Sequence, residues 1–436
     1  MKILLVTHHL EDYAGTETYV YTVTQALIAQ GHQVTIYTPL IGEMAKKISA
    51  LGVFVSDDIN LVRDYCKYDI IHCQHNTTAI IARYYFPDTP MVLMVHGVLP
   101  FLEQPPAIEL GVHKYIAVSE EVTNHLKSRY NIHNIELLHN GIDIKRFKAL
   151  KKINKVLKNV LVMSNHYTDE VKNNVESACK SLGLNIKHIG YPNMVWNTES
   201  FINEADLVIT LARGALESMS CERAVLIYDI HGGDGMITPD LFHESIKCNL
   251  SGRRFAIKYD VEQLIEEMKK YDPEMGEINR EIVVQNFSIE RHVEKLVEIY
   301  KEAIAQDQTD VRIPPIVDYF FFYQQNIKNK NQMIDLLKKE GQTHQQLESQ
   351  LKSQLNLKEE QINQYRSELD KARVTIKDNE QQIQDLNSRI GDLLEQIEYY
   401  RHRIADMENK TASLEETLNQ ILNSKLWKFA SFFRRD

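Results

Sequence analysis

Residues 206–229, DLVITLARGALESMSCERAVLIYD, contain the pattern that decides the fold. An apolar run at 207–211 is followed by a helix-forming segment that begins near Ala212, and a second apolar run occupies 224–228. Two short apolar strands joined by a helix are typical of a parallel sheet that is buried on both faces. Ligands of such sheets bind beyond the carboxyl ends of the strands, against helix N-termini. The segment therefore predicts an anion or nucleotide site at the start of its helix.

The same alternation of apolar runs and amphipathic stretches extends from residue 1 to about residue 310. In the first part, periodicity predicts strands at 2–8, 32–38, 69–75, 91–97, 114–119 and 135–140, and helices at 16–30, 77–86 and 119–130. In the second part, it predicts strands at 160–165, 185–191, 206–211, 224–229 and 254–259, and a closing helix at 288–304. We therefore expect two Rossmann-like α/β domains, 1–150 and 151–310, that face each other across a ligand-binding cleft.

Composition excludes several classes of protein. The 436 residues carry a formal net charge of -10 and a pI near 6.0, which argues against nucleic acid as the main partner. The five cysteines form no CxxC pair, so reduced thiols are favoured over a disulfide framework. The opening MKILLVTHH predicts a strand, because its apolar run is too short for a signal peptide. Without an apolar run of about 18 residues, we expect a cytoplasmic protein, or one that lies peripherally at the inner face of the membrane.

The C-terminal part has a seven-residue repeat. Every seventh residue from Leu355 to Leu418 is aliphatic except Thr411. This repeat predicts a coiled coil over 333–423, preceded by a linker helix at 311–332. Isoleucine at the first seam position and leucine at the fourth favour a parallel homodimer. A single long helix that folds back on its own chain is the alternative.

The last residues, SKLWKFASFFRRD at 424–436, combine four aromatic side chains with lysines and arginines. Such an amphipathic stretch suits the headgroup region of a membrane with anionic lipids. A hydrophobic cap on the coiled coil, or a docking peptide, is the other interpretation. A single short segment binds membranes weakly, so dimerisation would strengthen this contact through avidity.

Five stretches resemble one known family. They are HHLEDYAGTETYVYTVTQALIAQGHQVTIYT (8–38), MVLMVHG (91–97), KYIAVSEEVTNHL (114–126), IELLHNGIDIKRF (135–147) and NFSIERHVEKLVEIYKEAI (286–304). Together they are similar to glycosyltransferase family 4, whose members are retaining enzymes of the GT-B fold. The resemblance covers residues 1 to about 305. It implies a nucleotide-sugar donor and a glycan acceptor, with the acceptor side in the first domain, and neither a cofactor nor a bound metal.

Two positions in the first domain are candidate site residues. Gly15, followed by Thr16, lies where the first strand turns into a helix, and a glycine there lets backbone N–H groups approach a phosphate. His96 follows a strand and should face the cleft. The resemblance implies that His96 contacts the donor sugar, so we assign it as the catalytic candidate. Alone, a histidine at a strand end is more often a structural hydrogen-bonding residue.

The opening segment supplies the second half of the site. The resemblance implies that Glu217 holds the ribose hydroxyls of the donor, and that the loop Arg213, Gly214 and Ala215 holds its diphosphate. A guanidinium in this loop suits phosphate oxygens, and a carboxylate accepts two O–H donors well. The alternative is a glutamate that only interacts favourably with the helix dipole.

The sequence departs from the family pattern at two places. Ile209 stands where the family has a glutamate that contacts the donor sugar. Ser164-Asn165-His166 replaces a glycine-arginine pair, with Lys172 as a possible substitute cation, and Asn165 as a donor-binding candidate. The leaving diphosphate still needs positive charge. We therefore nominate Arg253 and Arg254 beside Arg213, and we expect HGGDGMITPD (231–240) to be a loop that brings Asp234 near the sugar.

Three functions fit these residues. The first is a glycosyltransferase for a surface polysaccharide or another glycan. The second is an inactive GT-B module that acts as a coiled-coil scaffold in a glycan-assembly complex, which Ile209 favours. The third is a nucleotide-sugar epimerase of similar shape, which the NGID motif at 140–143 disfavours because that motif belongs to the transferases. The donor, the acceptor and the linkage cannot be read from the sequence.

The repeat makes a direct prediction about oligomeric state. The full chain is expected to be a dimer in light scattering, and a chain truncated after residue 330 is expected to be a monomer that still binds nucleotide. A truncated chain that stays dimeric would contradict the coiled-coil assignment.

Overall fold

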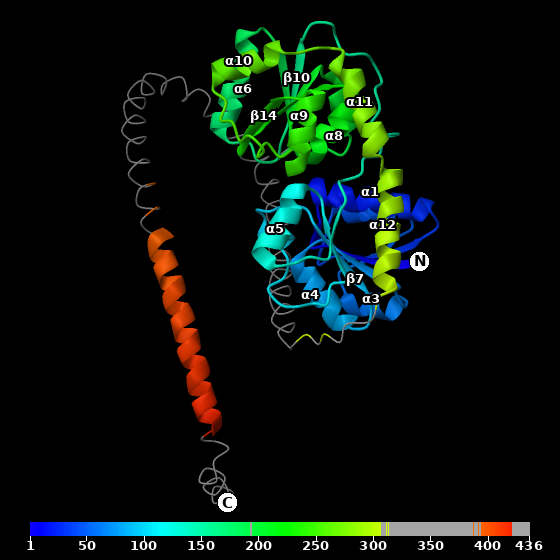
Figure 1. Ribbon diagram of the computed structural model, residues 1–436, viewed down its shortest axis with the longest axis vertical. Helices are drawn as coiled ribbons and strands as arrows, with labels where there is room; N and C mark the ends of the chain where they lie inside the picture. Colours follow the sequence, from blue (N-terminus) through cyan, green and yellow to red (C-terminus); the bar gives the residue numbers. More distant parts are fainter. Residues whose placement is uncertain are drawn as a thin grey trace, which may run out of the picture. The chain divides into compact units, whose positions relative to one another are not determined.

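The computed structural model describes residues 1–191, 194–306 and 394–420, with single residues at 311, 313, 387 and 391. The chain forms two compact units, Met1–Asn331 and Gln332–Asp436. The first unit contains two lobes, each built on its own sheet (Figure 1). Most of the expected linker helix at 311–332, the first part of the expected coiled coil and the whole tail at 424–436 lie outside the described residues.

The first lobe has a seven-stranded parallel sheet in the order β5-β3-β1-β6-β7-β8-β9. Its strands are β1 (Lys2–Val6), β3 (Gln33–Tyr37), β5 (Phe54–Ser56), β6 (Ile70–Cys73), β7 (Met91–Val95), β8 (Lys114–Ala117) and β9 (Ile135–Leu137). A small pair, β2 (His9–Leu10) and β4 (Leu40–Ile41), lies beside it. Its helices are α1 (Gly15–Ala29), α2 (Glu43–Ser49), α3 (Ile59–Tyr65), α4 (Asn76–Tyr85), η1 (Phe101–Glu103) and α5 (Glu120–Tyr130). The six strands predicted here are confirmed.

The second lobe has a five-stranded sheet in the order β11-β10-β12-β13-β14. Its strands are β10 (Asn159–Met163), β11 (Asn185–Ile189), β12 (Leu207–Thr210), β13 (Ala224–Asp229) and β14 (Gly232–Met236). Its helices are α6 (Asp169–Ser181), α7 (Thr198–Glu204), α8 (Ala212–Ser220), α9 (Pro239–Ser245), η2 (Ile246–Cys248), α10 (Val261–Lys269) and α11 (Met275–Asn286). The first four strands are parallel neighbours, and β14 pairs antiparallel with β13.

The edge of this second sheet differs from the sequence prediction. The segment HGGDGM was expected to be a loop, but it contains the buried strand β14, and the expected strand at 254–259 makes only one bridge, between Ile257 and Gly233. Close packing explains the glycines, because a Cβ at Gly233 would lie 2.4 Å from the carbonyl oxygen of Ile227. The strand is therefore made of residues that usually weaken strands.

Two segments of the chain, one at Ile142 and one at Phe287 and Ile289, run side by side from one lobe to the other. The amide of Ile142 donates to the Phe287 carbonyl at 2.7 Å, and the amide of Ile289 donates to the Ile142 carbonyl at 2.9 Å. Gly141, in the NGID motif, lies directly against the segment that follows Phe287. A Cβ added at Gly141 would be 2.6 Å from Cβ of His292. A side chain at position 141 would therefore push the crossing segments apart.

The closing helix α12 (Ile289–Ile304) packs with the first lobe, although the sequence placed residues 151–310 in the second domain. Val293, Leu296 and Tyr300 are fully buried in the same core as β1, β6 and β7. The helix lies beside α1 at the edge of the lobe (Figure 1). Amphipathic periodicity predicted the helix correctly but could not say which lobe its apolar face would cover.

The second unit contains a helix over residues 394–420. The seam residues Ile397, Tyr400, Ile404 and Met407 are all more than half exposed on this helix. The coiled-coil pairing stays a prediction. Among the described helices, none combines the length and the apolar character that crossing a bilayer requires.

The core position of α12 leads to a stability prediction. Leu296→Ala should lower the free energy of unfolding by about 2–5 kcal/mol, because it leaves a cavity in the core of the first lobe. Ile304→Ala, on the same helix but 38% exposed, should cost much less. Urea unfolding followed by circular dichroism measures both, and equal losses in the two variants would contradict the packing of α12 on the first lobe.

Candidate functional site

The candidate site lies where the strands of both lobes end. In the first sheet β1 is flanked by β3 and β6, and in the second sheet β10 is flanked by β11 and β12, so strand order reverses at β1 and at β10. Parallel sheets bind ligands beyond such reversal points. His9 and His75 follow β1 and β6, and Ser164 and Arg213 follow β10 and β12. All four residues line cavities.

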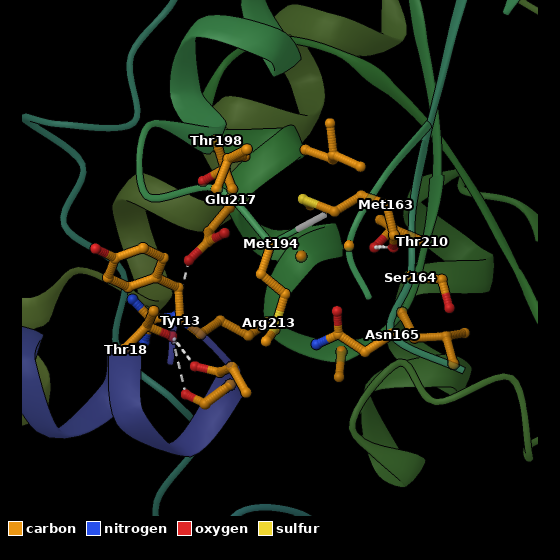
Figure 2. Close-up of a pocket in the computed structure, with 18 of the residues that line it drawn as sticks. Tyr13, Thr18, Met163, Ser164, Asn165, Met194, Thr198, Thr210, Arg213 and Glu217 are labelled. Carbon is orange, nitrogen blue, oxygen red and sulfur yellow. Dashed lines mark hydrogen bonds and ion pairs between the residues drawn. The ribbon is translucent and has the colours of Figure 1, made fainter. Parts of the chain in front are cut away.

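The first cavity has a volume of about 280 Å³. Figure 2 shows Tyr13 and Glu217 on one side of it and Met163, Ser164 and Asn165 on the other. Residues from both lobes line this cavity, among them Tyr13, Gly15, Thr18, Arg146, Ser164, Asn165, Gly190, Met194, Trp196, Thr210, Arg213, Gly214, Glu217 and Asp229.

Two helix N-termini bring backbone N–H groups to this cavity. Helix α1 begins at Gly15 and helix α8 at Ala212, and neither has a side-chain cap. Helices α5 and α12, by contrast, are capped by Ser119 and Ser288. The first N–H groups of a helix have no partner within the helix, and the helix dipole places partial positive charge there. The two ends are therefore suited to an anion.

The start of α8 is shaped for close approach. A Cβ at Gly214 would lie 2.5 Å from Oγ1 of Thr210 and 2.8 Å from Cε of Met163, so a larger residue would have to displace the cavity wall. Ala212 has φ 50, a left-handed conformation that costs a residue with a Cβ roughly 1–2 kcal/mol. Strained backbone of this kind often occurs at functional sites.

Arg213 and Glu217 form an ion pair on this helix. Nε of Arg213 donates to Oε1 of Glu217 at 2.7 Å, and both side chains are about 90% buried, with 11% and 10% exposed. Burial raises the pKa of the Glu217 carboxyl, and the Arg213 guanidinium opposes this rise. Arg213 also donates to the Gly141 carbonyl at 3.3 Å and to Oγ1 of Thr22 at 3.0 Å. The guanidinium thus ties α8 to the crossing segment and to α1 of the first lobe.

A second guanidinium lies at the wall formed by Trp196. Arg146 contacts Oε2 of Glu199 at 2.8 Å, donates to the Trp196 carbonyl, and stacks over the Trp196 ring at 4.1 Å. The Trp196 ring also contacts Tyr13 and Tyr21 of the first lobe, at 5.6 Å and 4.8 Å between centroids. The sequence analysis missed Trp196, because it lies in a loop without periodicity. One sequence feature could have indicated Trp196: it is one of the chain's two tryptophans, and it lies between a strand and a helix.

The second cavity, of about 660 Å³, adjoins the first. Gly15, Asn165, Met194, Ala212 and Arg213 line both cavities. The second cavity is otherwise lined mainly by the first lobe, by His9, Glu11, Asp12, Thr16, Glu17, Tyr19, His75, His96, Leu102, Glu103 and Asn140. Burial, with Asp12 and Glu11 nearby, raises the pKa of Glu17 to about 7.

His96 is held by a buried chain of hydrogen bonds. Its Nε2 contacts Oε1 of Gln74, Nε2 of Gln74 lies 2.9 Å from Nε2 of His72, and Nδ1 of His72 lies 2.5 Å from the Tyr300 hydroxyl. Burial lowers the pKa of His96 to about 3 and that of His72 to about 3. Both rings are therefore neutral at pH 7. Since Gln74 offers an oxygen to His96, Nε2 carries the proton, which leaves Nδ1 of His96 as an acceptor.

The structure brings most nominated residues to the cavities. Gly15, Asn165, Arg213, Gly214 and Glu217 line the first cavity, and Thr16 and His96 line the second.

Three nominated residues lie elsewhere. Ala215 is fully buried in the core of the second lobe. Arg253 forms a two-pronged pair with Glu121 of α5, at 3.0 Å and 2.5 Å, and Arg254 pairs with Glu244. Neither arginine lines either of the two cavities described above, and a nearby carboxylate pairs with each.

Three further residues discussed with the departures from the family pattern, Ile209, Lys172 and Asp234, do not line either cavity, whereas Asn165 does. Ile209 is fully buried in the sheet, and Lys172 lies 4.0 Å from Glu176 on α6. Asp234 is buried in β14, where it accepts a hydrogen bond from the Phe255 amide.

Comparison with known proteins agrees with this architecture. Residues 13–146 match the model of the family described as Glycosyltransferase Family 4. A glycosyltransferase from Rickettsia africae superposes with a TM-score of 0.50 at 16% identity, over 70% of this chain and 99% of its own. Anabaena HepE, solved with UDP and glucose, superposes with a TM-score of 0.51 at 12% identity, over 69% and 99%. No curated protein sequence matches the chain significantly.

The fold is that of a GT-B glycosyltransferase. At these identities the likeness concerns the arrangement of the two lobes. The family match lies in the first lobe, which agrees with the resemblance carried there by the glycine loop and the NGID motif.

The buried histidines predict how stability depends on pH. Burial lowers the pKa of His8 and His292 to about 4, of His72 and His96 to about 3, and of His75 to about 2. Each histidine binds fewer protons in the folded state than in the unfolded state. Its contribution to the free energy of unfolding is therefore complete above about pH 6.5 and is lost as pH falls toward the pKa of the folded state. The melting temperature should therefore fall between pH 7.5 and pH 5.5.

Buried carboxyl groups with a raised pKa, among them Glu217, act in the opposite direction. The pKa values of Glu17 and Glu103 are raised to about 7 by burial, so their folded forms bind more protons and gain stability as pH falls. Five histidines should outweigh them. In differential scanning fluorimetry, His8→Asn should reduce the acid-induced fall, and exposed His133→Asn should leave it unchanged. A melting temperature that rises on acidification would contradict this account.

Proposed function

We propose that this protein is a glycosyltransferase that moves a sugar from a nucleotide-sugar donor to a glycan acceptor. The observation that carries this proposal is the first cavity. Two uncapped helix N-termini, the Arg213 guanidinium and the buried Glu217 carboxylate face it from two lobes with the GT-B arrangement. Helix N-termini and arginine bind phosphate, and a carboxylate accepts hydrogen bonds from ribose hydroxyls.

The donor's parts fit different walls of the first cavity. The diphosphate would lie between the start of α8 and Gly15, within reach of Arg213. The ribose hydroxyls would donate to Glu217. The flat base would lie toward Met194 and Trp196, which line the same cavity. This arrangement accounts for the charge that the leaving diphosphate requires, since it replaces the missing glycine-arginine pair by Arg213.

The sugar and the acceptor would occupy the second cavity. His96 lines it with an acceptor nitrogen and stays neutral, which suits a hydrogen bond from a sugar hydroxyl rather than proton transfer. We propose retention of anomeric configuration by front-face substitution, in which the departing phosphate assists deprotonation of the acceptor, without metal or cofactor. Among the described residues, no group of three or more His, Cys, Asp or Glu side chains is placed to hold a metal ion.

The scaffold function remains a second candidate because of Ile209. Its side chain lies in the core of the second lobe, so it contributes no polar group where the family has a glutamate. An inactive module would bind the nucleotide without turnover. In either case, the exposed apolar seam of 394–420 supports a homodimer through the C-terminal helix, and synthesis of a surface polysaccharide at the inner face of the membrane is the setting we propose.

Nucleotide binding by a Glu217 variant tests the proposal. Glu217→Gln should weaken the binding of UDP or GDP by roughly 10- to 100-fold, because one charge-assisted hydrogen bond contributes about 1.5–3 kcal/mol. The control Glu204→Gln makes the same change in an exposed ion pair with Lys187 and should leave affinity unchanged. Isothermal titration calorimetry gives the affinities, and thermal shift confirms binding to the folded state.

A product screen across UDP- and GDP-sugars then separates the two candidates. Turnover by the native chain that Glu217→Gln abolishes supports the transferase, whereas nucleotide binding without turnover supports the scaffold. Unchanged nucleotide affinity in Glu217→Gln would overturn the assignment of the first cavity.

A further inference from the structure

Two buried oxygen atoms beside the second cavity have no hydrogen-bond donor among the residues that the structure describes. They are Oε2 of Glu17 and Oδ1 of Asn140, and both residues line the cavity. Glu17 is 2% exposed and Asn140 is 7% exposed. A buried acceptor without a donor destabilises the folded protein, and a ligand that supplies the donor removes this cost. The second cavity is therefore prepared for a ligand that carries several O–H or N–H groups.

The fixed hydrogen bonds around Glu17 support this assignment. Oε1 of Glu17 lies 3.3 Å from Nε2 of His9, which leaves Oε2 as the oxygen without a partner. Nδ1 of His75 accepts from the His8 amide at 3.0 Å, so Nε2 of His75 carries a proton and is a donor. A neighbouring donor and two acceptors match a hydroxyl-rich molecule, since each hydroxyl both donates and accepts.

The charges around the second cavity are mainly negative. Four carboxyl residues line it, namely Glu11, Asp12, Glu17 and Glu103, and Arg213 is the one arginine or lysine among the described lining residues. Because burial raises the pKa of Glu17 and Glu103 to about 7, these two carboxyl groups carry only part of their negative charge at pH 7. Arg213 is already paired with Glu217. The histidines His9, His75 and His96 add no positive charge at pH 7, because burial lowers the pKa of each. An anionic ligand would meet net repulsion from these carboxyl groups, and discrimination of this kind is a common source of specificity.

We infer that the second cavity selects an acceptor saccharide without negative charge, either neutral or carrying an amine, through Glu17 and Asn140. This inference rests on the proposed function, since it takes the second cavity as the acceptor site. It names the acceptor class and two specificity residues. Uronate and phosphorylated saccharides are disfavoured by the carboxyl groups that line the cavity, one of which, Glu17, also receives hydrogen bonds from the accepted ligands.

Direct binding to the full chain tests this inference without requiring turnover. The probes are matched sets of methyl glycosides in the gluco and galacto series: the neutral glycoside, the 2-amino glycoside and the uronide. Saturation-transfer NMR and titration would be carried out with saturating UDP and, separately, with GDP. We expect the neutral and amino glycosides to bind at least tenfold more tightly than the uronides. Uronides that bind equally or better, or no binding of any neutral or amino glycoside, would overturn the inference.

Two variants test the residues. Glu17→Gln should weaken amino-glycoside binding about tenfold and reduce discrimination against uronides, whereas nucleotide affinity should change less than twofold. Asn140→Asp, which adds a carboxylate at the same cavity, should change discrimination in the opposite direction and provides a test if Glu17→Gln does not fold. The control Glu43→Gln alters an exposed ion pair with Lys46. It should change neither the discrimination between glycosides nor the nucleotide affinity. Unaltered discrimination in both cavity variants would overturn the role of these residues.

The outcome also separates this inference from the proposed function. If nucleotides do not bind the native chain but glycosides bind with the expected selectivity, the proposed donor site fails and the saccharide site stands. If nucleotides bind and Glu217→Gln weakens them, but uronides bind best, the donor site stands and the acceptor inference fails.

Discussion

The contact on which the site depends is the one that the Arg213 guanidinium makes with three parts of the first unit. It bonds Glu217 on its own helix, Thr22 on α1 and the carbonyl of Gly141 in the crossing segment. The first cavity lies between these same elements. A guanidinium suits such a position because its five N–H groups point in fixed directions. One side chain therefore fixes the wall of the cavity and joins the two lobes.

The sequence predicted the sheets well because their strands are buried parallel strands, which are continuous apolar runs. It failed at β14, where glycines replace apolar residues because neighbouring backbone lies too close for a Cβ. It also could not assign α12 to the first lobe. Periodicity identifies the apolar face of a helix, but the surface that this face covers is decided by the crossing at Ile142 and Phe287, which depends on residues far apart in sequence.

A place at the cavities could be predicted for residues at or just after a strand end, as for His96 and Gly214, whereas Glu217 was indicated only by the family resemblance. The positive charge of an arginine was less useful for predicting which residues line the cavities. Arg253 lies near the helices of both lobes, but Glu121 pairs with it, and no sequence pattern connects residues that are 132 positions apart. Glu17 was overlooked for the opposite reason. In the sequence it reads as an acidic residue in the first turn of a helix, which is favourable without any ligand, whereas its burial becomes evident only once the lobe has folded.

The pairing of Arg213 with Glu217 raises the question of whether this arginine can also serve a diphosphate. Its contacts with the described residues use one N–H of Nε, one of Nη1 and one of Nη2. Two of the five N–H groups are then left, and Arg213 lines both cavities. A phosphate oxygen could therefore bind without breaking the contacts to Thr22 and Gly141. A lysine in this position would have three donors, all from one atom, and could not hold both lobes and a ligand in fixed directions. If the first cavity binds the proposed donor, a single arginine on α8 is thus chemically sufficient for the charge of the glycine-arginine pair, and donor binding and the junction of the lobes depend on the same side chain.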